Sequence, residues 1–416
     1  MKQYPYMNCR FGKIAFGVFL FAMLLLARDT LVTACILGFN ASQFLMLGLI
    51  CVVGMGFLAV HRRQWKEILT DPRILVLLAV TVVILLPMTV KRDWQMMYFS
   101  ILLCLYLAVF LTYFISYRDA AKYYVLILTA LGVYSVLATY FLRILPDRGI
   151  LSVPVFFNSH DVKFHNFGLA FVSDDFVKNR NFGIFREPGV YQYFIILALF
   201  LNNYAVSWRK QSCLWTVNVL LSVTMLTTFA TGGVAELGLL AVVVFFDKKL
   251  YRDKRFLWLA IGLVAAVILA LVVIVIRKGE LYWELYGMLV YKFSGDADSS
   301  SERITAILMD LDFFLRSPLV GRNISEVLHA VANNTASTML MLALFGVFGG
   351  ALHLASWVAL AWQKNSSLWV NLALLALLLL SFNTQNLIAD VFFWLFPVMA
   401  LVERGLPKLI ELKKKV

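Results

Sequence analysis

The chain has 416 residues, of which 62% are hydrophobic and only 15% are charged, whereas a soluble globular protein carries charge on roughly a quarter of its residues. This composition excludes an ordinary soluble domain and predicts a membrane protein with several spans. The net charge of +13 is not accompanied by a basic and aromatic nucleic-acid motif, so we expect no nucleic acid as a partner. The five cysteines show no metal-site spacing, and we expect neither a metal nor another cofactor.

Apolar runs bounded by polar residues predict twelve membrane-spanning helices, because one span needs about 20 mainly apolar residues. Their approximate ranges in chain order are 11–27, 33–60, 74–90, 96–115, 123–142, 188–206, 213–230, 233–246, 256–276, 334–361, 368–381 and 387–402. The short breaks at 230–233 and 381–386 divide runs that are too long for a single span, so each predicts a helical hairpin. We therefore expect an all-α polytopic protein with one integral membrane domain over residues 1–416.

Lysine and arginine are distributed unevenly between the two predicted sides of the membrane. The termini and alternate connections, taken as one side, hold 22 Lys and Arg against 7 Asp and Glu. The other side, with the membrane-embedded Glu236 and Asp390 included, holds 15 against 17. Cytoplasmic loops are enriched in Lys and Arg, so the positive side and both termini are predicted to be cytoplasmic. No clear cleavage site follows the first apolar run, which we interpret as a retained span.

Two connections on the predicted outer side are long, at residues 143–187 and 277–333. Long loops are uncommon unless they serve a function, so we expect the function on the outer face. Within the second loop, 299–318 has the pattern of a helix, and 279–293 predicts a further interfacial helix, with Tyr and Trp at the water boundary. The helix at 299–318 has one apolar stripe that suits a membrane surface or the side of the bundle. The stripe consists of Ile304, Ile307, Leu308, Leu311 and Leu315.

Two acids, Glu236 and Asp390, lie inside apolar runs near their predicted outer ends. Acids within a membrane are costly and usually face an interior cavity. The alternative is that both carboxylates are solvated at the level of the lipid headgroups. The sequence leaves both interpretations open.

The stretch RNFGIFREPG at 180–189 is unusual for this chain, because it places two arginines and a glutamate directly before an apolar run. It resembles the pattern Arg-x-x-Gly-x-Phe-x-(Asn/Glu)-Pro at the start of a span. That pattern marks the O-antigen ligase and O-antigen polymerase superfamily of bacterial envelope glycan enzymes. The residues that fill it here are Arg180, Gly183, Phe185, Glu187 and Pro188.

Three further stretches resemble motifs of the same superfamily in the same order. They are TFATGGVAELGLL at 228–240, SSSERITAILMDLDFFLRSPLVGRN at 299–323 and NNTASTMLMLALFGVFGG at 333–350. The first departs from the family pattern, because Ala230 stands where Ser is usual and the common Arg of that turn is missing. In the third, Asn333 stands where ligases usually have His, and His329 lies one helical turn upstream as a candidate substitute.

The resemblance implies an enzyme at the outer face of the cytoplasmic membrane that acts on undecaprenyl-diphosphate-linked oligosaccharides. Family members resemble metal-independent glycosyltransferases of the multi-span (GT-C-like) class, with two large outer loops and a cavity that opens to the outer leaflet. Polymerases transfer the growing glycan to a new lipid-linked repeat unit, and ligases transfer the finished glycan to another acceptor. The partners implied are the lipid-linked oligosaccharide, membrane lipid and, for a polymerase, a chain-length regulator.

The departing diphosphate of such a donor builds up negative charge, which fixed cations must stabilise in the absence of a metal. Arginine suits this role, because it is always charged and binds phosphate oxygens in a bidentate way. The candidates are Arg180, Arg186 and Arg303. The alternative is that arginines at the end of a span contact only the phosphates of membrane lipids.

The attacking sugar hydroxyl becomes a better nucleophile if a base removes its proton. Glu187 or His329 is the candidate base, and Asn334 is a candidate for positioning the hydroxyl. The alternative for Glu187 and Pro188 is that they only begin a helix, where an acid and a proline are favourable.

Polymerase function is favoured over ligase function by the FREP variant and by the missing histidine. Ligase-type transfer of a finished glycan stays an alternative. A lipid-oligosaccharide flippase or transporter is the alternative from another class, since twelve spans with both termini inside suit many transporters. Against it, no repeat relates the two halves, and the cations cluster at the ends of the spans.

Overall fold

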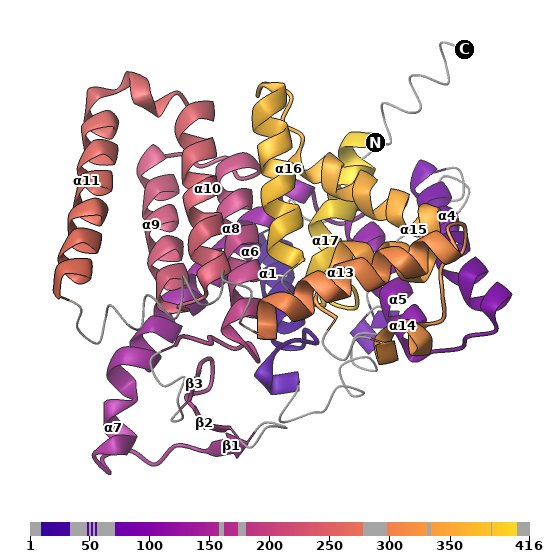
Figure 1. Ribbon diagram of the computed structural model, residues 1–416, viewed down its shortest axis with the longest axis horizontal. Helices are drawn as coiled ribbons and strands as arrows, with labels where there is room; N and C mark the ends of the chain where they lie inside the picture. Colours follow the sequence, from indigo (N-terminus) through magenta and orange to yellow (C-terminus); the bar gives the residue numbers. More distant parts are fainter. Residues whose placement is uncertain are drawn as a thin grey trace.

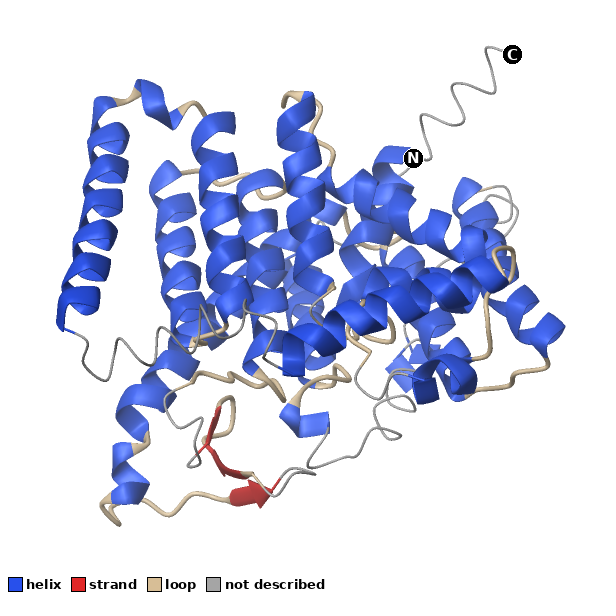
Figure 2. Ribbon diagram, viewed as in Figure 1, coloured by secondary structure: helices blue, strands red, loops and turns tan. Residues whose placement is uncertain are grey.

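The computed structural model describes residues 10–33, 48–49, 51–52, 55, 71–157, 162–173, 180–277, 298–330, 334–383 and 385–405. The protein is mostly helical. Several helices run side by side as a bundle, and a small sheet lies at one end of it (Figures 1 and 2). The end of the bundle that carries the sheet is named the sheet end below.

The helices follow the predicted apolar runs closely. In chain order they are α1 (Arg10–Leu25), α4 (Pro72–Lys91), α5 (Met96–Leu111), α6 (Tyr117–Leu137), α7 (Ile144–Asp147), α8 (Pro188–Tyr204), α9 (Gln211–Thr227), α10 (Thr231–Asp247), α11 (Lys254–Arg277), α13 (Asp298–Arg316), α14 (Ile324–Ala330), α15 (Ser337–Ala361), α16 (Leu368–Phe382) and α17 (Val391–Ala400). Short π or 3-10 turns lie at Ala138–Leu142, Leu250–Arg252 and Leu401–Gly405. The predicted break at 230–233 is confirmed to within three residues, because α9 ends at Thr227 and α10 begins at Thr231.

Three described helical segments are long and apolar enough to cross a membrane, namely Pro72–Lys91, Tyr117–Pro146 and Ser337–Ala361. Shorter apolar helices accompany them, and these elements indicate a membrane-embedded protein. The shorter apolar helices are Gly12–Leu25, Met96–Leu111, Gln211–Thr227 and Leu368–Phe382. The number of twelve spans stays a prediction. The predicted span at 33–60 lies largely outside the described residues, and the predicted helix at 279–293 lies wholly outside them.

The first long loop contains an antiparallel sheet, so the all-α prediction was wrong there. Its strands β1 (Val155–Phe157), β2 (Lys163–Asn166) and β3 (Phe171–Ser173) pair in the order β1-β2-β3. Aromatic and β-branched residues favour extended backbone when one side can be covered. Here Phe164 and Phe171 pack with Leu31 and Phe182 in a small separate core. The burial of these side chains stabilises the pairing of the short strands.

Two helices form the centre of the bundle. All ten residues of α17 and nearly all of α8 are buried, as expected for helices that are apolar on every side. Tyrosine hydroxyls form hydrogen bonds between the central helices. Tyr124 of α6 donates to the Phe194 carbonyl of α8, and Tyr193 of α8 donates to the Phe392 carbonyl of α17. These bonds pair polar groups that would otherwise be costly inside the bundle.

Helix α13 runs across the bundle helices instead of along them (Figure 1) and packs on α15. Its packed side carries Ala306 and Asp310, which are fully buried. The predicted apolar stripe faces outward, since Ile304 is 61% exposed and Leu315 67% exposed. This orientation combines the two predicted possibilities: the helix packs across the bundle and presents its apolar stripe to the surroundings, as a surface-lying membrane helix does.

Helix α15 is broken at Gly346, whose backbone (φ 63°, ψ −158°) is not helical. The segment after α13 fills the break. Val347 donates its backbone N–H to the Pro318 carbonyl, and the Arg322 N–H bonds the Ala343 carbonyl, which Val347 would use in an unbroken helix. The Lys91 ammonium donates to the Leu344 and Arg322 carbonyls at 2.8 and 2.7 Å. We name this junction the α15 break.

Candidate functional site

The residues that precede α8 are held by the turn between α9 and α10. The Asn181 backbone N–H bonds the Thr227 carbonyl, and its side-chain amide donates to the hydroxyls of Ser135 and Thr227. Its amide oxygen accepts the Gly183 N–H at 2.9 Å. Gly183 has φ +56°, and a Cβ there would lie 2.7 Å from the Tyr191 ring. The Gly of the motif is thus required by both backbone and packing.

Arg180 lies at the sheet end beside the same turn. Its Nε donates to the Thr228 carbonyl at 3.1 Å, and no ion pair within 4 Å joins it to a carboxylate in the described part of the chain. Burial lowers the pKa of its guanidinium, and the negative charge of Glu187 acts in the opposite direction. Arginine nevertheless stays protonated. Arg180 is therefore a half-buried cation whose remaining N–H groups are available to an anion.

Arg186 has a different environment, because its charge is already balanced. Its Nε lies 2.8 Å from the Asp29 carboxylate, and its Nη1 lies 3.6 Å from that of Glu187. The backbones join as well, since the Arg186 N–H bonds the Asp29 carbonyl and the Leu31 N–H bonds the Ile184 carbonyl. Asp29 is buried, so its negative charge needs this partner. The sequence left open which arginine matters more, and the geometry favours Arg180 as the available cation.

Glu187 is the N-cap residue of α8 and Pro188 lies in the first turn, so these residues begin a helix as predicted. Its side chain makes no capping bond, however, and is 50% exposed. The Gln385 amide approaches its carboxylate at 3.4 Å. The backbone of Glu187 thus begins α8, while its carboxylate makes no hydrogen bond to the helix N-terminus.

Gln385 links this cluster to the start of α15. Its carbonyl accepts the Ser337 hydroxyl at 2.6 Å, and that hydroxyl accepts the Leu387 N–H. Three residues before Ser337, the Asn334 amide donates to both carboxylate oxygens of Asp310 at 2.8 and 2.9 Å. Burial raises the pKa of Asp310 to about 7, and the bonds from Asn334 act in the opposite direction. Contacts therefore join all four motif stretches.

Two candidate residues stand apart from this cluster. Arg303 is exposed in the first part of α13, and His329 is exposed near the end of α14. Neither forms a hydrogen bond or ion pair with another candidate within the described residues. Asn333 lies outside the described residues. The structure thus brings together Arg180, Arg186 and Glu187, and it connects Asn334 to them only through Ser337 and Gln385.

Further polar residues belong to the region, and of these only Glu236 lies within a motif stretch. Gln192, one turn into α8, donates to the buried Glu236 carboxylate at 2.9 Å. Asp390 caps α17 through a bond from the Phe392 N–H, and one of its oxygens has no described partner. Burial of both acids favours the interior interpretation over headgroup solvation. Sequence reasoning singled out these acids, whereas Asp29 and Gln385 gave no signal beyond being polar residues in breaks between apolar runs.

The comparisons with known proteins give no further assignment. No protein-family model, no curated protein and no solved structure matches the chain. The functional interpretation of the site therefore rests on its geometry and on the motif resemblance.

Proposed function

We propose that the protein is a glycosyltransferase that polymerises undecaprenyl-diphosphate-linked oligosaccharide repeat units at the outer face of the cytoplasmic membrane, without a metal. The products would be O-antigen, capsular or exopolysaccharide chains. The observation that carries the proposal is Arg180, a half-buried arginine in the loop before α8 that has no ion-pair partner in the described residues. The link between the four motif stretches supports it.

In this proposal Arg180 binds the diphosphate of the donor. The glycan is released as the bond between the anomeric carbon and the diphosphate oxygen breaks, and the bonding electrons leave with the diphosphate. A fixed cation in a site of low dielectric stabilises that charge with little reorganisation. Arg186 holds the loop before α8 in place through its ion pair with Asp29. The exposed Arg303 on α13 supplies a second cation when substrate is bound. The α8 N-terminus adds a favourable partial positive charge.

Glu187 is the proposed base. The acceptor hydroxyl attacks the anomeric carbon, and its proton passes to the Glu187 carboxylate, whose side chain is half exposed and makes no capping bond. Displacement by one hydroxyl inverts the anomeric centre. Asn334 uses both amide N–H bonds on Asp310 and its oxygen on the Ala336 N–H, so it acts by fixing α13 on α15. His329 is the alternative base only if α14 approaches the site when substrate binds.

The function is tested by deleting the gene and separating the surface glycans on a gel. A polymerase is expected to leave a single capped repeat unit in place of the ladder. Accumulation of long lipid-linked glycan would instead indicate a ligase. Unchanged glycan would reject both enzymes.

The site is tested by restoring the gene with substitutions. Arg180→Ala is expected to abolish the ladder while the protein still accumulates in the membrane, and Arg180→Lys to restore it weakly, because lysine lacks the bidentate fork. Arg148→Ala is the matched control, since Arg148 is an exposed arginine of the same loop and should keep the full ladder. Full activity of Arg180→Ala would remove Arg180 from the mechanism.

A further inference from the structure

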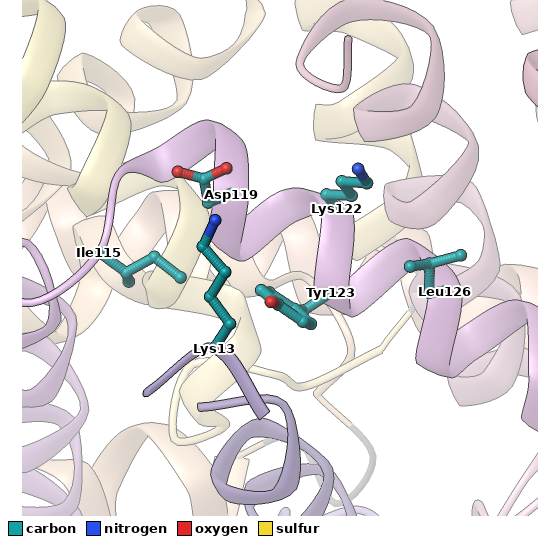
Figure 3. A pocket seen from close by; sticks show the side chains of 6 residues that line it. All are labelled: Lys13, Ile115, Asp119, Lys122, Tyr123 and Leu126. Carbon is teal, nitrogen blue, oxygen red and sulfur yellow. The ribbon is translucent and has the colours of Figure 1, made fainter. Parts of the chain in front are cut away.

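A pocket lies between α1 and α6 at the end of the bundle opposite to the sheet end. It has a volume of about 320 Å³ and is lined by Lys13, Ile115, Asp119, Lys122, Tyr123 and Leu126. Lys13 comes from α1 and points toward Asp119 in the first turn of α6, and Tyr123 and Leu126 follow further along α6 (Figure 3). A volume above about 300 Å³ is sufficient for a small organic ligand.

The polar part of the pocket has a net positive charge, from two lysines against one aspartate. Lys122 lies 5.6 Å above the Trp208 ring, which restricts its stem. Asp119 already accepts the Ser116 hydroxyl at 2.7 Å, so part of its acceptor capacity is used within α6. A ligand with one negative charge and a few hydroxyl donors would complement two ammonium groups and this carboxylate.

The apolar part of the pocket lies beside exposed apolar side chains of α1 and α6, which a lipid chain would cover in a membrane. Leu126 is 42% exposed, and the exposed side chains on the same two helices include Ile14 (58%) and Val18 (63%). The polar groups lie in the first two turns of the helices, and Val18 and Leu126 follow them toward the middle. A ligand with a polar head and apolar chains fits this order, whereas a soluble anion would use only the first part.

The pocket is separated from the candidate site by the length of α8. Lys122 contacts Trp208, beyond the end of α8 at Tyr204, whereas Arg180 precedes its start at Pro188. A helix of 17 residues is roughly 25 Å long. The charge distribution predicts this end to be cytoplasmic, where basic pockets between helices bind anionic headgroups.

We propose that this pocket binds one anionic phospholipid of the cytoplasmic leaflet, of the phosphatidylglycerol type. Lys13 and Lys122 hold the phosphodiester, Asp119 accepts hydroxyls of the headgroup, and the acyl chains lie along α1 and α6 past Leu126. The site lies outside the glycosyl-transfer site and does not depend on that function.

The test uses the full-length protein in detergent and native mass spectrometry, with phosphatidylglycerol, phosphatidylethanolamine and phosphatidylcholine of matched acyl chains. The wild type is expected to retain one phosphatidylglycerol. Lys13→Gln with Lys122→Gln should weaken its binding about 30-fold, because each lysine near an anionic surface contributes roughly a factor of five. Leu126→Trp leaves the charge unchanged and should weaken binding by filling the pocket.

The control is Lys254→Gln with Lys364→Gln, which removes two exposed lysines predicted to lie on the same side of the membrane. This variant should retain the lipid as the wild type does. Equal retention of phosphatidylethanolamine or phosphatidylcholine would overturn the proposal, and so would equal loss in the control. Displacement of the lipid by millimolar inorganic phosphate would also overturn it, since the site would then recognise the free anion.

Discussion

The loop before α8 and the α15 break both place a cation at a helix end, but they use it differently. At the α15 break, Lys91 donates to the Leu344 carbonyl of α15 and to the Arg322 carbonyl of the segment that fills the break. Before α8, Arg180 donates to one carbonyl, and no carboxylate within 4 Å pairs with it in the described residues. A cation whose N–H groups are already used in hydrogen bonds has a structural role, whereas a cation with unused N–H groups can bind a ligand. Residue type and depth in the membrane alone do not make this distinction.

The largest effect on stability is expected at the α15 break itself. Gly346→Ala should destabilise the protein by about 4 kcal/mol or more, because a φ of +63° with extended ψ is nearly restricted to glycine. The new Cβ would also lie 2.4 Å from the Leu319 carbonyl oxygen. Thermal unfolding in detergent measures the change. Gly238→Ala in α10 is the control, since nothing lies within 4 Å of its Cβ position; equal behaviour of the two variants would show that the break is not required.

The second prediction compares the two arginines of the motif. Arg186→Met should destabilise the protein by about 3 kcal/mol, because the buried Asp29 carboxylate loses its partner. Arg180→Met should cost about 1 kcal/mol, since only one hydrogen bond to a carbonyl is lost. The double variant with Asp29→Asn and Arg186→Met should recover part of the loss. An additive double variant would mean that the pair is not energetically coupled.

The third prediction concerns the acid that joins α13 to α15. The pKa of Asp310 is raised by burial to about 7, against an ordinary value near 4 in the unfolded chain. Between these values the folded state binds more protons than the unfolded state, so stability should fall as pH rises from 5 to 7, by about 2 kcal/mol. Asp310→Asn should remove this part of the pH dependence while keeping a bond from Asn334. An unchanged slope in Asp310→Asn would assign the pH dependence to other groups.

Much of the architecture could be predicted from the sequence, because hydrophobic runs and breaks determine helices locally. The break near 230–233 and the helix α13 with its apolar stripe are such cases, although the direction of the stripe was left open. The ion pair between Arg186 and Asp29 joins positions far apart in the chain, and no local pattern contains it. The sheet was missed because its strands are only three or four residues long and gain their stability from Leu31, which is distant in the chain.

The smallest effect on stability is expected at Glu187, where structure and function separate most clearly. Glu187→Gln should change the free energy of unfolding by less than about 0.5 kcal/mol, because the side chain makes no capping bond and is half exposed. The same substitution should strongly reduce the glycan ladder if the carboxylate accepts the proton of the acceptor hydroxyl, since an amide cannot do so. Glu326→Gln, an exposed acid on α14 paired with Arg322 at 3.8 Å, is the control and should leave the ladder unchanged. A full ladder with Glu187→Gln would restrict Glu187 to starting α8 and make His329 the next residue to replace.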